Sequence, residues 1–194
     1  MNVLYDYNQD ELKSIVSECG EPSFRAAQIY RNFASGLAIS EMTDVPEKLK
    51  RALLEKYVDA PCKIIKKIVS EKDGTIKYLF ELSDGNVVEG VVMTYKYGKT
   101  QCVSTQVGCR MGCKFCASTL NGLIRNLTKG ELLFTVSAAN RDLGGTLKKR
   151  EITNIVLMGS GEPLDNYANV TSFIRELSDP HNLNVSPRNV SLST

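Results

Sequence analysis

Three cysteines near the middle of the chain have a spacing that suits a metal centre. Cys109, Cys113 and Cys116 form the pattern C-x3-C-x2-C, inside a stretch from Cys102 that holds four of the six cysteines. Gaps this short let three thiolates converge from one turn of backbone, and nearby glycines supply the freedom that a tight ligand loop needs. An iron–sulfur cube has four irons, so three cysteines leave one iron open to a substrate or cofactor. The pattern predicts an iron–sulfur centre that does chemistry.

Zinc and disulfides are the alternatives for these cysteines. Structural zinc usually takes four protein ligands in two paired knuckles. This chain has one C-x2-C pair, a single histidine, His181, far downstream, and Cys102 seven residues before Cys109. Disulfides are disfavoured because the cysteines are crowded and the polar, acidic first residues do not resemble a secretory leader. Zinc stays open as the second interpretation.

The surrounding string Q-C-V-S-T-Q-V-G-C-R-M-G-C-K-F-C-A-S resembles the radical S-adenosylmethionine (SAM) enzymes. Within them it closely resembles the radical-SAM ribosomal RNA adenine-C2 methyltransferase family (RlmN), and further matches follow in order from the amino-terminal helices to Ser193. The resemblance implies a [4Fe-4S] cluster held by Cys109, Cys113 and Cys116. It also implies that SAM binds at the open iron.

Two further residues take roles from the same resemblance. Glu89 lies thirteen residues before Cys102, where the family has its proposed proton acceptor. Cys102 matches the cysteine that resolves the protein–RNA adduct through a disulfide with a methyl-carrying cysteine. Periodicity alone instead places Glu89 on the solvent face of an alternating strand, and Cys102 could be a buried strand cysteine.

The segment Gly159-Ser160-Gly161-Glu162-Pro163 is the second glycine-rich stretch. It fails as a dinucleotide loop because Leu164 occupies the last glycine position of G-x-G-x-x-G and Pro163 would interrupt the helix entry. In radical-SAM enzymes a G-E-P-like segment binds the amino group of the methionine moiety, and Gly161 and Glu162 match it. Ser193 matches a family serine that contacts the cofactor.

The elements that must position these residues change in character along the chain. Apolar residues at helical spacing predict helices between about 8 and 57, with Ser23 as a plausible cap of the second. Three strand-like runs between 64 and 93 are separated by Asp73-Gly74 and Asp84-Gly85, a strong hairpin signal. We expect a helical accessory domain over 1–60 and an antiparallel β meander over 61–98.

The remainder, 99–194, is expected to form the first part of a radical-SAM (β/α) barrel, which makes the fold α/β. Thr128 to Glu131 reads as a capping box before a helix, followed by an apolar strand over 152–158, a helix over 167–177 and a strand over 189–193. This alternation predicts a parallel sheet with right-handed crossovers, and the strand at 152–158 is of the kind buried on both faces. Ligands collect at the carboxyl ends of such strands, where each motif falls.

Composition leaves the partner open. The 194 residues are 42% hydrophobic, enough for one core and a small appended domain, and no run approaches the roughly 20 apolar residues of a membrane span. A cytoplasmic protein is expected. The net charge of +2 neither supports nor excludes RNA as a partner.

The run from Lys148 to Arg150 is expected to be a solvated loop. Candidate RNA contacts, which could equally be solvated helix faces, are Arg25, Arg31, Lys48, Lys50 and Arg51.

The resemblance implies that an electron from the cluster splits SAM and that a 5′-deoxyadenosyl radical makes carbon-2 of adenine reachable. The implied partners are ribosomal RNA, with transfer RNA as a second candidate, and an electron donor such as flavodoxin or ferredoxin. The protein is expected to be monomeric and not bound to a membrane.

The later strands and the methyl-carrying cysteine of the family find no match in these residues. The chain as given is therefore expected to be an incomplete enzyme that cannot finish the methyl cycle alone. One alternative is a fragment that binds RNA or metal without catalysis. Another is the family branch that methylates adenine carbon-8, although Gly-Glu-Pro rather than Gly-Glu-Ala favours carbon-2.

Overall fold

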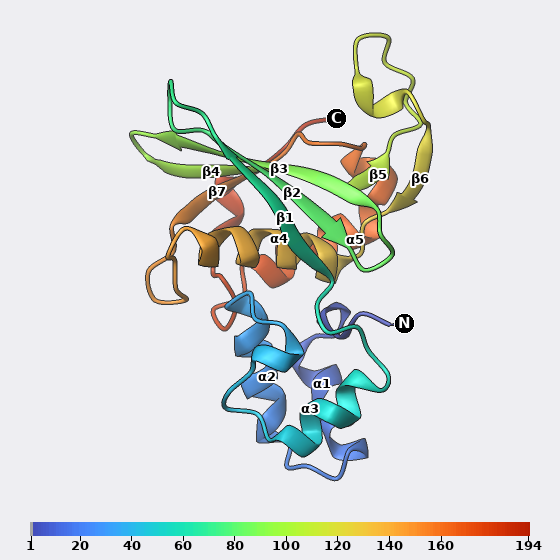
Figure 1. The fold of residues 1–194 in the computed structure, drawn as a ribbon, viewed down its shortest axis with the longest axis vertical. Helices are drawn as coiled ribbons and strands as arrows, with labels where there is room; N and C mark the ends of the chain where they lie inside the picture. The colour runs from blue at the N-terminus through green and yellow to red at the C-terminus, as the bar shows by residue number, and fades with distance from the viewer. Residues whose placement is uncertain (1) are drawn as a thin grey trace.

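The chain forms a mixed β-sheet with helices against one face and a helical module beyond those helices (Figure 1). The computed structural model describes residues 2–194. The main sheet has the strand order β1-β2-β3-β4-β7-β8, and β5 and β6 form a separate hairpin. The strands are β1 Cys62–Val69, β2 Ile76–Leu82, β3 Val87–Tyr95, β4 Gly98–Val103, β5 Gln106–Gly108, β6 Leu123–Asn126, β7 Ile152–Leu157 and β8 Val190–Leu192. The α-helices are α1 Gln9–Glu18, α2 Phe24–Ala34, α3 Glu47–Leu54, α4 Lys129–Asp142 and α5 Tyr167–Leu177.

The helical module comprises α1, α2 and α3, as the sequence predicts. Asn8 caps α1 by accepting from the Asp10 and Glu11 amides, and the Glu11 side chain accepts from the Asn8 amide. The expectation that Ser23 caps α2 is wrong, because its side chain makes no capping hydrogen bond. Its backbone already has helical angles (φ −57°, ψ −26°), whereas a capping side chain works from extended backbone.

The antiparallel meander is confirmed, and it continues into the parallel part of the sheet. Asp73 and Asp84 accept from the amides two residues ahead and so shape the two predicted hairpin turns. β3 pairs with β4 antiparallel, β4 with β7 parallel and β7 with β8 parallel. One sheet thus spans residue 98, and the domain boundaries at 60 and 98 stay predictions.

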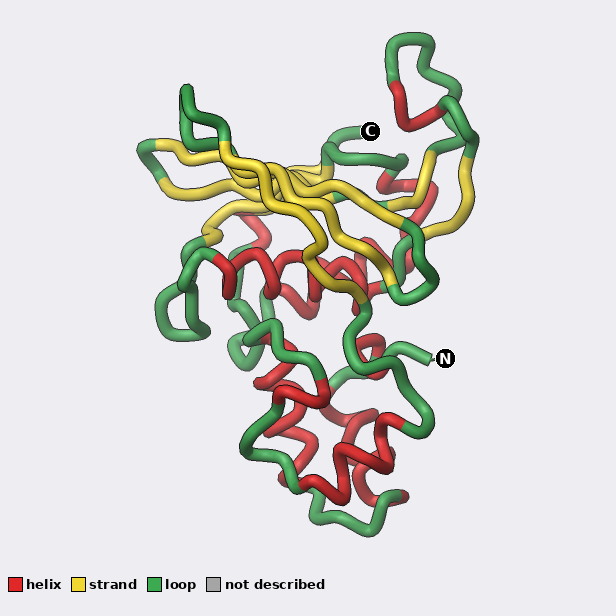
Figure 2. Tube along the Cα trace, in the orientation of Figure 1, coloured by secondary structure: helices red, strands yellow, loops and turns green. Residues whose placement is uncertain are grey.

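Helices α4 and α5 cover one face of this sheet, as Figure 2 shows with the red helices beneath the yellow strands. α4 is buried along most of its length because β1, β2, β4 and β7 contact one side and the helical module contacts the other. Phe134 of α4 meets the Tyr5 ring edge-on at 5.0 Å, and Tyr5 stacks on Phe33 of α2. The capping box at Thr128 and Glu131 is confirmed.

The opposite face of the sheet is more open. On β7, Ile152, Ile155 and Leu157 are buried, but the residues between them are partly exposed. The prediction that this strand is buried on both faces is therefore wrong, because the described helices pack on one face only. Within residues 2–194, none of the helices has the length and apolar character needed to cross a membrane.

Candidate active site

A cavity of about 510 Å³ lies at the carboxyl ends of β4 and β7, on the open face of the sheet. Three residues predicted for chemistry line it: Glu89 from β3, Cys102 from β4 and Cys116 from the cysteine loop. Gly159 and Ser160, which follow β7, complete this side of the wall. We call it the strand-end cavity. Four separate segments of the chain therefore meet where the parallel-sheet rule places ligands.

Glu89 stands on the open face of β3. Its neighbours Val88 and Gly90 face the helices, as the alternation predicts. The Glu89 side chain is 56% exposed, and its Oε1 lies 2.7 Å from the Lys77 Nζ on β2. The Ser104 hydroxyl donates to the Glu89 carbonyl at 2.8 Å, which fixes the strand beside the cavity. The face of β3 that is open to solvent is also the face that lines the cavity, so Glu89 can reach a molecule bound there. Its role as proton acceptor stays a prediction.

Cys102 lies between Val91 of β3 and Val156 of β7 in the sheet. Its side chain is half-buried, and this burial raises the pKa of the thiol, although a hydrogen bond with the Met158 backbone acts in the opposite direction. Cys102 is therefore kept as a protonated thiol near neutral pH. Cys102 is a strand cysteine, as the alternative interpretation expects, but it also lines the cavity.

The cysteine loop, residues 109–122, projects beyond the β5–β6 hairpin (Figure 1, upper right). At its base the Cys109 amide donates to the Gly122 carbonyl at 3.0 Å, and Gly108 has a φ of +75° against that same carbonyl. No side chain fits at Gly108, because a Cβ there would overlap the Gly122 oxygen. Cys109 is buried, Cys116 is half-buried and Cys113 is exposed. The loop is thus closed at its base and open at its tip.

The donor set fits an iron–sulfur cluster. All six cysteines are free, so three thiols are available within one loop. Among residues 2–194, however, no three cysteine, histidine or carboxylate side chains already converge as a metal site. The same observation gives no support to zinc held by Cys102 or His181. Cys109, Cys113 and Cys116 are the residues that would hold a cluster.

The glycine-rich turn after β7 packs tightly on the segment between β4 and β5. The Ser160 carbonyl accepts from the Thr105 amide at 2.8 Å. Gly161 has a φ of +101°, and a Cβ on it would lie 2.6 Å from the Gln106 Cβ. Only glycine fits there without a shift of the backbone. Glu162 turns its carboxylate onto the Leu164 amide (2.9 Å) and so starts the short 3₁₀ helix Pro163–Asn166.

Gly161, Glu162 and Ser193 flank the strand-end cavity rather than line it. Gly161 and Glu162 follow Ser160 directly along the chain, and Ser193 is exposed just after β8, the neighbour of β7 in the sheet. Their predicted contacts with SAM stay predictions.

Sequence reasoning missed two polar residues that organise the turn: Gln106 beneath it and Asp165 at its end. Gln106 is fully buried, and its side chain contacts both the turn and β6. Asp165 receives the guanidinium of Arg110, and this ion pair and then Gln106 hold the pKa of the Asp165 carboxyl below its usual range. Gln106 lies inside the string that carries the resemblance, which was the one available signal.

The candidate RNA-binding residues of the helical module are largely engaged with neighbouring acids. Arg31 pairs with Asp44 at 3.2 Å, and Lys50 pairs with Glu47 at 2.9 Å. Arg51 lies 3.9 Å from the same Glu47, and Arg25 donates to Gln28 and to the Asp44 carbonyl. Lys48 is exposed on α3. These contacts favour the interpretation as ordinary solvated helix faces.

The basic run in the α4–β7 connection is partly structural. Lys148 and Lys149 are exposed, as expected for a solvated loop. Arg150 instead donates to the carbonyls of Leu183 and Asn184, at 2.7 and 2.6 Å. It therefore fastens this loop to the segment that leads into β8.

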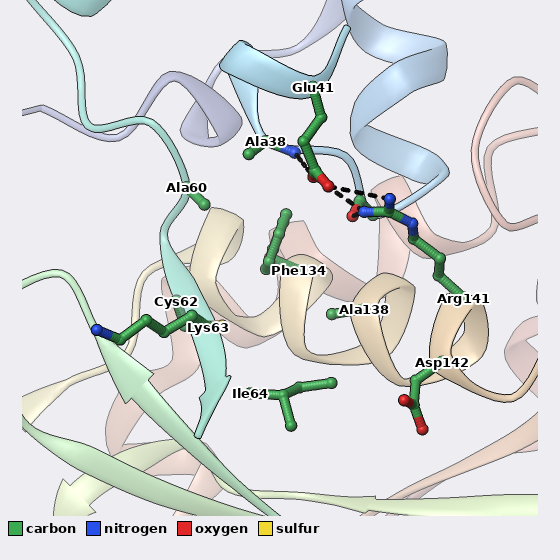
Figure 3. Close-up of a pocket in the computed structure, with 11 residues that line it drawn as sticks. Ala38, Glu41, Ala60, Cys62, Lys63, Ile64, Phe134, Ala138, Arg141 and Asp142 are labelled. Atoms are coloured by element: carbon green, nitrogen blue, oxygen red, sulfur yellow. Dashed lines mark hydrogen bonds and ion pairs between the residues drawn. The ribbon is translucent and has the colours of Figure 1, made fainter. Parts of the chain in front are cut away.

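A second cavity, of about 400 Å³, lies where the helical module meets β1 and α4 (Figure 3). Ile64, Phe134 and Ala138 form its apolar part. Its main charges neutralise each other, because Arg141 makes two bonds of 2.9 and 3.0 Å to the Glu41 carboxylate. It holds none of the residues predicted for chemistry, so we place the candidate active site at the strand-end cavity.

A solved structure has the same architecture. The chain matches the crystal structure of a radical SAM methyltransferase from Sphaerobacter thermophilus with a TM-score of 0.89 and 36% identity, over 100% of this chain and 57% of the other. The chain therefore has the α/β fold of part of a radical SAM methyltransferase, and the predicted fold class is confirmed. No protein-family model matches the chain.

Sequence relatives narrow this class. The chain is 45% identical over 196 residues to the probable dual-specificity RNA methyltransferase RlmN of Clostridium botulinum strain Loch Maree, covering 100% of this chain and 56% of the relative. The corresponding protein of Alkaliphilus oremlandii is 46% identical over 185 residues, covering 95% of this chain and 52% of the relative. The predicted resemblance to the RlmN family is confirmed, and the chain spans about half the length of these curated relatives.

Proposed function

We propose that this chain serves in radical SAM-dependent methylation of adenine carbon-2 in RNA. The observation that carries the proposal is the meeting of Glu89, Cys102 and Cys116 with the Gly159–Ser160 turn at the strand-end cavity. These residues come from four separate segments, and Glu89, Cys102 and Cys116 each match a position in the family pattern. The names of the relatives support RNA as the substrate.

Cys109, Cys113 and Cys116 would hold a [4Fe-4S] cluster at the mouth of this cavity. When bound, such a cluster supplies the electron that splits the sulfonium of SAM. Gly161 and Glu162 would hold the methionine moiety, since the turn offers close backbone approach and a carboxylate. Ser193, after the neighbouring strand, would add a contact from the other side.

Glu89 and Cys102 are the proposed residues for proton transfer and for release of the methylated RNA. Glu89 would accept a proton through its carboxylate, which Lys77 holds at the edge of the cavity. Cys102 would give up its thiol proton and attack the sulfur of the methyl-carrying cysteine, a residue that finds no match in these residues. The carbon–sulfur bond of the adduct would break as the disulfide forms, and its electron pair would pass to the former methyl carbon, which takes up a proton to give the methylated RNA. The half-burial of Cys102 protects its thiol until then. Both side chains line one cavity, so a single bound adenine could meet each of them in turn.

Both ribosomal and transfer RNA are proposed substrates, because the relatives are named dual-specificity enzymes. An electron donor of the flavodoxin or ferredoxin type is the proposed redox partner. We further propose a monomeric, cytoplasmic protein. Because many of its basic groups are paired, the helical module would contact RNA through few exposed cations such as Lys48.

Anaerobic reconstitution with iron and sulfide tests the metal centre. We expect a brown, oxygen-sensitive chain whose electron-paramagnetic-resonance spectrum changes when SAM is added. The Cys113→Ser variant should lose the colour and the spectral change, whereas Cys19→Ser, a matched change in α1–α2, should keep both. A stoichiometric, colourless zinc centre would contradict the proposal and support a non-catalytic binding fragment.

Nucleoside analysis tests the reaction. Assayed alone with RNA and a reductant, this chain is expected to release 5′-deoxyadenosine from SAM without methylating adenine. A chain of the relatives' length should yield 2-methyladenosine, detected by mass spectrometry of digested RNA. Release of 8-methyladenosine would instead place the protein with the carbon-8 branch. Methylation by the 194-residue chain itself would overturn the expectation that it is incomplete.

A further inference from the structure

Gln106 connects the glycine-rich turn to the base of the cysteine loop. It is the first residue of β5, two residues before Gly108, and its side chain is fully buried. We propose that Gln106 is a positioning residue that sets the turn 159–165 in register with the cysteine loop. The inference deepens the proposed function, because these are the two segments that would hold SAM and its cluster.

The contacts of the Gln106 amide lie in two directions. Its Oε1 accepts from the Glu162 backbone amide at 2.8 Å, so Gln106 binds the main chain of the turn and not a side chain. Its Nε2 donates to the Asn126 Oδ1 at 2.8 Å and to the Asp165 Oδ2 at 3.0 Å. Asn126 ends β6, the strand on which the chain returns from the cysteine loop. One side chain therefore joins the turn, the 3₁₀ helix after it and the hairpin beneath the loop.

Asp165 extends this connection to the loop itself. Its side chain is only 11% exposed, and its second oxygen, Oδ1, pairs with the guanidinium of Arg110. Arg110 directly follows Cys109, the first predicted cluster ligand. The path from Glu162 to Cys109 thus runs through Gln106, Asp165 and Arg110 without an intervening gap.

A merely space-filling residue would not need these contacts. A buried amide costs free energy unless its donors and acceptor are paired, and here Oε1 and Nε2 are both paired. A satisfied buried polar network favours one arrangement over others that an apolar core would tolerate. Gly161 packs against the Gln106 Cβ, so the side chain also spaces the turn. A shift of the turn relative to the loop would break contacts at both ends.

Hydrogen–deuterium exchange on the full chain without cluster tests this coupling directly. Gln106→Met keeps the volume and removes the polar groups, so amide exchange at the peptide covering 159–166 should quicken about fivefold to tenfold. The matched control is Gln101→Met, since Gln101 is also fully buried but bonds to the Thr135 carbonyl on α4. It should leave the 159–166 peptide unchanged. Equal exchange in Gln106→Met and wild type, or equal quickening in both variants, would overturn the proposal.

Gln106→Glu separates the two directions and decides the case if Gln106→Met does not fold. A glutamate retains an acceptor for the Glu162 amide but loses the donor to Asn126 and Asp165. The new carboxylate would also repel Asp165, which now accepts from Gln106 at 3.0 Å. The peptide covering 122–127 and the Asp165 end of the 159–166 peptide should therefore exchange faster than in wild type, while the Glu162 amide keeps its acceptor. Unchanged exchange at 122–127 would contradict the positioning role.

A binding measurement then connects the geometry to SAM. In reconstituted protein, Gln106→Met should bind as much iron as wild type and bind SAM about tenfold more weakly, whereas Gln101→Met should match wild type in both. Equal SAM affinity at equal iron content would overturn the proposal. If wild type takes up no cluster, the proposed function fails, and the exchange experiment still decides whether Gln106 couples the two segments.

Discussion

The cysteine loop and the layer beneath it are built in opposite ways. In the loop, residues 109–122, Cys113 is exposed, and Phe115 and Leu120 are 94% and 81% exposed. The layer beneath, residues 103–108 with 159–166, buries Ser104, Thr105, Gln106 and Asn166 and pairs most of their polar groups. The ligand residues thus lie on a lightly packed segment, and the geometry that orients the segment lies below it.

This difference indicates where substitutions should affect folding and where they should affect chemistry alone. A segment with few buried contacts contributes little to the free energy of unfolding, so its residue types are free to serve a ligand. Buried hydrogen-bonded residues cannot be changed without leaving partners unpaired. The predictions below measure that contrast on chain without cluster.

The largest effect is expected at Arg125, at the base of the loop on β6. Its guanidinium makes two 2.8 Å bonds to Glu131, which is 2% exposed, and one of 2.6 Å to Asp84. Arg125→Met would leave the Glu131 carboxylate buried without its cation. The free energy of unfolding in urea should fall by about 3–5 kcal/mol.

Arg110→Met is the matched change within the loop. Arg110 is 64% exposed and pairs with Asp165, so this variant should lose much less stability than Arg125→Met. Equal losses in the two arginine variants would remove the contrast between the exposed loop and the buried ion pairs at its base.

Two glycines offer a second contrast of intermediate size. Gly161→Ala adds a Cβ 2.6 Å from the Gln106 Cβ at a φ of +101°, and it should cost about 2–4 kcal/mol. Gly112→Ala, in the loop, meets nothing within 4 Å and carries only the strain of a φ of +70°, so about 1 kcal/mol is expected. Thermal unfolding of both variants measures the difference. A Gly112→Ala cost as large as that of Gly161→Ala would show that the loop tip is packed.

Thiol reactivity should follow the same division. Burial raises the pKa of Cys62, and burial also raises the pKa of Cys102, because it outweighs the opposing hydrogen bond with the Met158 backbone. At pH 8 both therefore hold less thiolate than an ordinary cysteine, and their alkylation should speed up as the pH rises. Exposed Cys113 should react with iodoacetamide first, and peptide mass spectrometry reports the order. Labelling of Cys102 as fast as Cys113 at pH 8 would contradict this.

The smallest effect is expected at Phe115, which is 94% exposed. Phe115→Ser should change the free energy of unfolding by no more than about 0.5 kcal/mol, because no buried contact is lost. Urea unfolding measures it. Surface substitutions usually change stability by roughly 0.5 kcal/mol or less, so a loss above about 1.5 kcal/mol would mean that the loop tip has a structural partner.

Local signals in the sequence predicted much of this fold. The Asp-Gly turns gave the meander, Thr128 with Glu131 gave the start of α4, and the helix over 167–177 has the predicted bounds. Each depends on residues a few positions apart. The predicted cap at Ser23 was wrong for a local reason as well, since serine is a suitable capping residue but its backbone angles here are already helical.

The candidate site was predictable in its residue types and less so in its surroundings. Spacing placed the cysteines in one loop, and alternation placed Glu89 opposite Val88. The bond from Gln106 to the Glu162 amide joins residues 56 positions apart, and it depends on how β4 and β7 align in the sheet. Periodicity also could not say which face of the sheet would carry the cavity.

In the β3–β4 hairpin, the number of residues between Glu89 and Cys102 decides whether both side chains lie on the same face of the sheet. Val91 faces Cys102 across the pair, and Glu89 lies two residues before Val91 on the same face. Loss of a single residue from the tip between Tyr95 and Gly98 would invert one strand relative to the other and carry Cys102 to the helix side. Length changes at this tip should therefore be tolerated in evolution mainly in steps of two residues. The tip does not line the cavity, and yet it limits which insertions a working site can survive.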